Sequence, residues 1–129
     1  MSNTMRRGAV TVELAIAAPI LFLVIMASIE FSRVNMIRNS MENAAYEGAR
    51  RGVLPGATAG DCRSSTQFLL DVVGITDSTI TVTPSTILQT TEEISVDVEV
   101  QLAPNSYFIP TYFSGTVLRT SITLPRESG

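Results

Sequence analysis

One carboxylate of this chain lies where a charged side chain is costly. Glu13 is the only charged residue in the 21-residue stretch from Ala9 to Ile29, which is rich in Ala, Ile, Leu and Val. A carboxylate near the centre of a membrane helix costs about 2.5–3.5 kcal/mol on insertion scales, and less near an end. Because such a residue usually has a partner, Glu13 is the first candidate functional residue.

Residue types that the chain lacks exclude several kinds of chemistry. The 129 residues include no His and a single cysteine, Cys62. Without His there is no imidazole base, no Ser-His or Cys-His nucleophile pair and no imidazole metal ligand. One cysteine forms neither an internal disulfide nor a Cys-rich metal site, and Asp61 has no second acid close by in sequence. We therefore expect that the protein is not an enzyme and that it binds no metal ion and no cofactor.

Length and charge narrow the class of protein further. A chain of 129 residues allows one small domain. Its charged fraction of 16% is below the roughly 25% that is typical of soluble domains, and its mean hydropathy is +0.28. The net charge of −3 makes it a poor candidate for binding nucleic acid. These values favour a membrane-anchored protein.

The stretch from Ala9 to Ile29 is long enough to be the anchor. A helix of this length reaches roughly 30 Å, which is the thickness of the hydrocarbon core of a bilayer. Arg6 and Arg7 precede it and favour a cytoplasmic N-terminus. Arg33 and Arg38 follow it and favour the opposite orientation. We give the first pair more weight, because the first segment usually sets the orientation. A removable secretory signal fits poorly, since no Ala-x-Ala site lies near Ile29, and an ordinary signal anchor is the simpler alternative.

The residues around Glu13 resemble a known processing site. Gly8 follows a short basic leader, Glu13 is the fifth residue after it, and a long apolar helix continues, as in the type III signal of type IV pilins and pseudopilins. Ala-Ala-Pro at positions 17–19 and the acid in Ile29-Glu30-Phe31 are similar to the TadE family, the pseudopilins of the tight-adherence (Tad, or Flp) pilus. The segment NSMENAAYEGARRGV and the final strand ending in LPRE are similar too. Leu14 stands where many Flp-type prepilins have an aromatic residue, which argues against a major Flp pilin.

The resemblance implies a processing step and a set of partners. A membrane-embedded prepilin peptidase would cut between Gly8 and Ala9 and remove leader residues 1–8, including Arg6 and Arg7. The new amine of Ala9 would then be the countercharge of Glu13, in the same subunit or a neighbouring one. Other pilin or pseudopilin subunits and the inner-membrane assembly platform would be the remaining partners.

The resemblance also implies a function and a location. We expect a minor or priming subunit of a Tad-type pilus or related secretion apparatus, with one span in the bacterial inner membrane. Its N-terminus would be cytoplasmic and its head outside, and it would bind no nucleic acid and no small-molecule substrate. Two alternatives stay open: a major type IV pilin-like filament subunit, and a membrane-tethered binding domain unrelated to pili.

The helix is expected to continue beyond the membrane as an amphipathic extension over residues 30–52. Pro19, inside the transmembrane helix of residues 9–29, should remove a backbone hydrogen bond and kink it. The extension carries a narrow apolar stripe, which either docks onto the chain's own head or packs against other subunits. A row of asparagines on another face is either solvated, which is the favoured interpretation, or lies at a contact between helices of a filament. Glu47 is placed to pair with Arg51. The stripe consists of Ile37, Met41, Ala44, Ala45 and Gly48, and the row of Asn35, Asn39 and Asn43.

Residues 53–129 are expected to form a small α+β head. A loop over residues 53–65 holds Cys62, as a half-buried thiol or as an intermolecular disulfide. A short helix over residues 66–73 would bury Phe68, Leu69, Val72 and Val73 and end at Gly74. Three stretches then alternate apolar and polar residues, which predicts an antiparallel sheet with one wet face: 79–83, 94–102 and 115–124.

An uncharged aromatic segment separates the last two strands. Residues 103–114 read APNSYFIPTYFS and gather Tyr107, Phe108, Ile109, Tyr112 and Phe113. They either fold back as a lid over the core or contact a protein or membrane interface, and the lid is the favoured interpretation. The fold class is therefore α+β: a long N-terminal transmembrane and amphipathic helix, then a small antiparallel sheet with a short helix.

Overall fold

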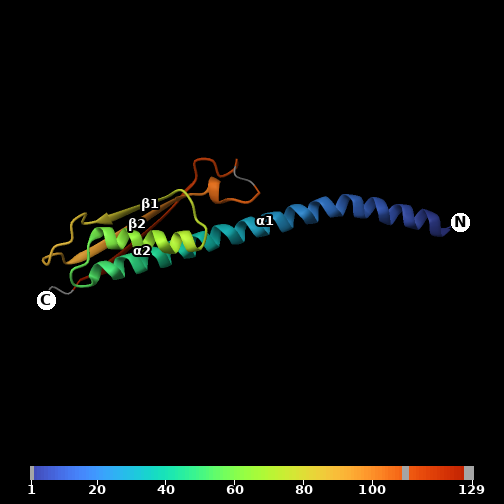
Figure 1. Cartoon of the computed structure of the whole chain (residues 1–129). Helices are drawn as coiled ribbons and strands as arrows, with labels where there is room; N and C mark the ends of the chain where they lie inside the picture. Colours follow the sequence, from blue (N-terminus) through green and yellow to red (C-terminus); the bar gives the residue numbers. More distant parts are fainter. Residues whose placement is uncertain (1, 109–110, 127–129) are drawn as a thin grey trace.

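The computed structural model describes residues 2–108 and 111–126, with side chains from Gly8 onward. Two helices, α1 (Ser2–Val53) and α2 (Ala59–Val72), precede three strands, β1 (Ser78–Thr83), β2 (Glu93–Gln101) and β3 (Val117–Pro125). A single 3-10 turn, Ala103–Asn105, follows β2. Figure 1 shows a head at one end of a long helix whose N-terminal half stands clear of it. The predicted α+β class is confirmed.

α1 is a single unbroken helix of 52 residues. At 1.5 Å per residue it is about 78 Å long, so the predicted transmembrane and amphipathic parts are two portions of one rod. The helix also includes the backbone of residues 2–8, the predicted leader, and passes through Pro19 without interruption. Figure 1 shows gentle curvature along the N-terminal half.

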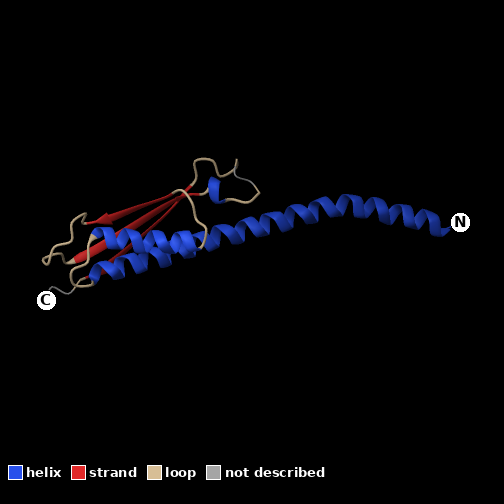
Figure 2. Cartoon of the chain, viewed as in Figure 1, coloured by secondary structure: helices blue, strands red, loops and turns tan. Residues whose placement is uncertain are grey.

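The head has two layers, with α2 and the C-terminal half of α1 on one face of the sheet (Figure 2). The strands are antiparallel in the order β1-β2-β3. In the register of the sheet, Val96 of the central strand pairs with Val82 on one side and Ile122 on the other. The inward residues of β2 are completely buried: Ile94, Val96, Val98 and Val100. The polar residues that alternate with them lie on the open face, as the alternation predicted.

The apolar stripe of α1 docks onto the head of its own chain. Ile37, Met41, Ala44 and Ala45 are at most 1% exposed in the core. The asparagine row, Asn35, Asn39 and Asn43, is exposed as expected. The predicted pairing of Glu47 with Arg51 is wrong: Glu47 contacts Arg50 at 3.6 Å, one residue earlier, at an exposed site where either pairing is weak.

α1 and α2 approach closely because two glycines face α2. A Cβ added at Gly48 would collide with Thr66 Oγ1, and one at Gly52 would lie 2.8 Å from Cys62 Sγ and 2.9 Å from Ile94 Cδ1. Thr66 is buried and donates its hydroxyl hydrogen to the carbonyl of Cys62 at 2.8 Å. No side chain larger than hydrogen fits at Gly48 without movement of the neighbouring helix.

The predicted start of the second helix is wrong by seven residues. α2 begins at Ala59 because Thr58 and Asp61 form a capping box: Thr58 Oγ1 accepts from the amide of Asp61, and Asp61 Oδ2 accepts from the amide of Thr58 at 2.9 Å. The end is as expected, since Gly74 adopts a φ of 70° and the amide of Ile75 bonds to the carbonyl of Leu70.

The buried face of α2 also differs from the predicted one. Its buried stripe consists of Ala59, Cys62, Thr66 and Leu70. Phe68 and Val72, which were predicted to pack inward, lie on the opposite face and are 66% and 67% exposed. Leu69 and Val73, from the same prediction, pack partly against the core.

Candidate functional site

The N-terminal half of α1 is exposed around its whole circumference. Large apolar side chains from Val10 to Val24 are 57–66% exposed, on every face of the helix. An 18-residue window in α1 has a mean hydropathy of 2.4 and no buried part, so the helix is long and apolar enough to cross a membrane. This exposure distinguishes the segment from the core helix of a soluble domain, which would bury one face.

The predicted processing residues lie together on this exposed segment. Apart from its chain neighbours and its own helix backbone, no atom of the described residues lies within 4 Å of a Cβ added at Gly8, and Ala9 and Glu13 are exposed. Ala9 and Glu13 are four residues apart, so they lie one above the other on the same helix face. The side chains of Arg6 and Arg7 lie outside the described residues. The geometry leaves Gly8, Ala9 and Glu13 open to partners from outside the chain.

A second cluster, which the sequence did not reveal, lies where the exposed half of α1 ends. Glu30, only 4% exposed, accepts hydrogen bonds from the Ser106 hydroxyl, from the amide of Tyr107 at 3.2 Å and from that of Phe108 at 3.3 Å. Arg33, one turn later, donates from Nε to the carbonyl of Asn105 at 3.2 Å. Its guanidinium carbon lies 4.9 Å from the centroid of the Tyr107 ring, a cation–π contact.

Asn105 connects this cluster to the rest of the head. Its buried amide donates to the carbonyls of Thr76 and Gln101 at 2.7 and 2.8 Å, and its oxygen accepts from the amide of Thr76 at 2.9 Å. We call Glu30, Arg33 and Asn105 the loop clamp. The loop clamp fastens the segment after β2 to α1. It also gives a structural role to Arg33, whose positive charge argued against the predicted orientation of the span in the membrane.

The aromatic segment is not a lid. Tyr107, Phe108 and Tyr112 are 61%, 45% and 87% exposed, and Phe113 alone of the described aromatics there packs against the core. Ile109 lies outside the described residues. The favoured interpretation fails because the loop clamp holds the segment at the end of the sheet, beside α1, rather than over the apolar face that the two helices already cover.

Cys62 is a free thiol as favoured, but fully rather than half buried, and the alternative of an intermolecular disulfide does not fit the folded head. Its thiol lies 3.4 Å from the carbonyl of Thr58. Burial raises the pKa of the thiol, and the neighbouring Asp61 carboxylate adds to the effect. The side-chain and backbone hydrogen bonds from Thr58 lower the pKa of Asp61. Both residues are therefore parts of the α2 N-terminus rather than of a reactive site.

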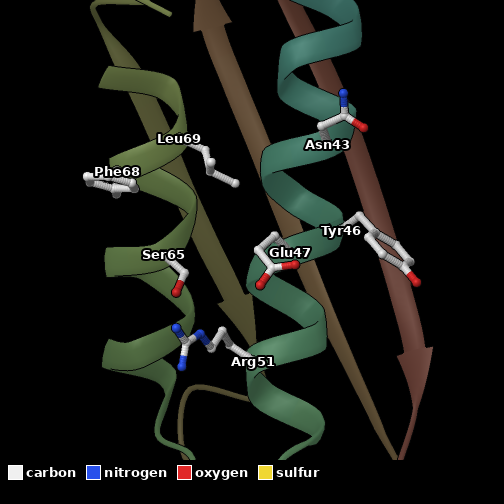
Figure 3. A pocket seen from close by; sticks show the side chains of 7 residues that line it. All are labelled: Asn43, Tyr46, Glu47, Arg51, Ser65, Phe68 and Leu69. Atoms are coloured by element: carbon white, nitrogen blue, oxygen red, sulfur yellow. The ribbon is translucent and has the colours of Figure 1, made fainter. Parts of the chain in front are cut away.

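One shallow groove lies between α1 and α2 (Figure 3). Arg51 and Ser65 face each other across it, whereas Phe68 and Tyr46 point away from it on opposite sides. Its lining residues are Asn43, Tyr46, Glu47, Arg51, Ser65, Phe68 and Leu69. Among the described residues no group of three His, Cys, Asp or Glu side chains could hold a metal ion.

The comparison with protein families gives one match. Residues 8–50 match the model of the TadE-like protein family, which confirms the recognition made from the sequence. No curated protein and no solved structure matches the chain significantly. The matched residues begin at Gly8 and lie entirely within α1, so they include the candidate processing site and exclude the sheet. The match indicates a Tad pilus-associated protein that interacts with other pilus components.

Proposed function

We propose that this chain is a TadE-like pseudopilin, a minor or priming subunit in assembly of a Tad-type pilus or a related secretion apparatus, without catalytic activity. The observation that carries the proposal is the exposed half of α1. Its side chains are apolar on every face, and its charge between Ala9 and Ile29 is the single carboxylate of Glu13. A helix of this kind is stable only in lipid or among other apolar helices, which are the two environments of a pilin-like subunit.

Processing by prepilin peptidase is the first step of the proposed pathway. The chain inserts with Arg6 and Arg7 in the cytoplasm and the head outside the bacterial inner membrane. The peptidase then cuts between Gly8 and Ala9. The open surroundings of Gly8 suit this step, and glycine costs a helix roughly 1 kcal/mol relative to alanine, which helps the backbone to extend into the protease.

Assembly is the second step, and Glu13 is the residue that drives it. Cleavage creates an α-amine on Ala9, one turn from Glu13 on the same face of the helix. In an apolar surrounding, an amine and a carboxylate are each costly alone and stabilise each other as a pair. The pair can form within a subunit or between a new subunit and its neighbour, and the second arrangement couples processing to assembly through the platform.

The test is a set of Glu13 variants in cells that produce the pilus. Glu13→Gln should still insert and be cut, because the scissile bond lies five residues upstream, but it should be recovered far less often with sheared pili. Glu13→Asp should restore part of the loss, limited by its shorter side chain. The matched control is Glu42→Gln, which removes an exposed carboxylate from the head portion of the same helix.

The outcome separates the proposal from its rivals. If Glu13→Gln assembles like the parent at equal membrane levels, the charge-pair mechanism is wrong and an ordinary anchor with a tethered binding domain gains support. A subunit as abundant in sheared filaments as the main pilin would instead indicate a major filament subunit. Loss of assembly for Glu42→Gln as well would remove the specificity on which the mechanism depends.

A further inference from the structure

The exposed aromatic side chains of the β2–β3 connection have no role in the proposed assembly mechanism. The connection lies at the end of the head that faces the N-terminal half of α1, and Figure 1 shows it reaching along α1 beyond the ends of the strands. Tyr107 lines a shallow groove together with α1 residues from Ser28 to Met36. The aromatic segment therefore lies at the height where the apolar span ends.

The loop clamp sets this height. Glu30 is the first residue after the apolar stretch, and it holds the hydroxyl of Ser106 and the amides of Tyr107 and Phe108. These bonds tie the aromatic segment to a fixed position on the membrane helix. Because α1 is continuous through this point, the insertion depth of the span and the position of the segment are mechanically linked.

The chemistry of the segment fits the boundary between water and lipid. Tyrosine is enriched at this boundary, because its ring is apolar and its hydroxyl is polar. Residues 103–118 carry no charge, and the Glu30 carboxylate beside them is only 4% exposed, so the segment presents little negative charge to an anionic lipid surface. The exposed apolar surface is also continuous with the span, since Ile29, which is 43% exposed, lines the same groove as Tyr107.

We propose that Tyr107, Phe108 and Tyr112 rest in the outer interface of the membrane that α1 spans, where they fix the height and tilt of the head. This inference rests on the membrane span of the proposed function but requires neither cleavage nor assembly. The surface that these three side chains contact is therefore the lipid bilayer. A second copy of the chain is the competing occupant, and the experiment distinguishes the two.

The chain has no Trp, so single substitutions create unique fluorescent reporters. Three full-length variants are reconstituted at low density in vesicles of phosphatidylethanolamine and phosphatidylglycerol. The lipids are brominated either close to the head group or deep in the acyl chain, in both leaflets, so the direction of insertion does not affect the result. Tyr112→Trp reports on the segment, Phe22→Trp on the span, and Tyr46→Trp on a distant exposed site.

The controls are exposed side chains at different heights along α1. Tyr46 is 50% exposed and lies sixteen residues after Glu30, about 24 Å farther along the helix. Phe22 is 66% exposed and lies eight residues before Glu30, about 12 Å toward the bilayer centre. Emission of Tyr112→Trp should be blue-shifted and quenched several-fold more by lipids brominated near the head group than that of Tyr46→Trp. Phe22→Trp should be quenched most by deep bromines.

Three results would overturn the inference. If Phe22→Trp is quenched while Tyr112→Trp behaves like Tyr46→Trp, the span is inserted and the segment does not touch lipid. If the blue shift of Tyr112→Trp disappears when the protein is diluted in lipid, its contact is a second copy. If Phe22→Trp escapes quenching, the membrane span itself fails, and the proposed function fails with it. Phe108→Trp repeats the test at a second position of the segment.

Discussion

The two halves of α1 have the same backbone and opposite surroundings. From Val10 to Val24 the large apolar side chains are 57–66% exposed on all faces. From Ile37 to Ala49 the aliphatic residues and Met41 form one stripe that is at most 1% exposed, while the other faces carry Asn, Arg and Glu residues and the exposed Tyr46. Glu30 and Arg33, at the junction, fasten the head to the helix.

The difference teaches that the distribution of apolar residues around a helix, rather than their number, indicates its surroundings. A stripe requires one neighbour, which the chain supplies with its own sheet and α2. An all-round apolar surface requires an apolar environment on every side, which a head of this size cannot supply. The first half therefore requires an apolar environment outside the described head, and the second half is buried by this chain alone.

The largest expected effect comes from truncating matched isoleucines in the two halves. Ile37→Ala should lower the free energy of unfolding of the head by about 2–5 kcal/mol, because Ile37 is completely buried. Ile20→Ala, at a position 58% exposed, should leave it unchanged. Chemical unfolding of the full chain in detergent micelles measures both. Equal losses would contradict the separation of the two halves.

A smaller effect is expected at the contact between α1 and α2. Gly48→Ala should destabilise the head by about 1–3 kcal/mol, because the added methyl group collides with the buried Thr66. Gly60→Ala is the matched control in α2, where an added Cβ lies an ordinary 3.5 Å from Thr58 Oγ1. It should be neutral or stabilising by up to about 1 kcal/mol. A neutral Gly48→Ala would mean that the two helices are not held this closely.

The smallest effect concerns the pH dependence of the head. The hydrogen bonds from Thr58 lower the pKa of Asp61 in the folded state, so the unfolded chain binds the proton more readily. Asp61 therefore contributes stability above the ordinary pKa of its carboxyl, and the contribution is lost as the pH falls through the lowered value. Unfolding midpoints of the full chain in micelles should fall at acidic pH with a steeper slope than those of Asp61→Asn. Identical slopes would show that the capping box does not depend on the charge.

Much of the fold could be predicted because it follows from the spacing of apolar and polar residues within short stretches of the sequence. The alternation of Ile94, Val96 and Val98 with polar residues predicted β2, and the stripe from Ile37 to Ala45 predicted the docked face of α1. The start of α2 was missed because Gly60, Ser64 and Ser65 are typical of loops, although the Thr58–Asp61 spacing of a capping box was present.

The loop clamp could not be predicted because its partners are distant in sequence. Glu30 and Ser106 are 76 residues apart, and no periodicity links a residue on a helix to a turn after a strand. From the sequence, Arg33 was expected to affect only the orientation of the membrane span. In the structure, its Nε donates to the carbonyl of Asn105 and its guanidinium lies over the ring of Tyr107. Gly8, Ala9 and Glu13, by contrast, were recognised from a linear motif that needs no tertiary contact.

The most direct test of the central claim is the N-terminal residue of the protein purified from membranes of cells with active prepilin peptidase. The account predicts that sequencing and intact mass give Ala9 first, in a chain eight residues shorter than 129 and two charges more negative than −3, because Arg6 and Arg7 are removed. Gly8→Val should leave the protein uncut in the same membranes. A parent protein that begins at Met1 or Ser2 in those cells would contradict the account.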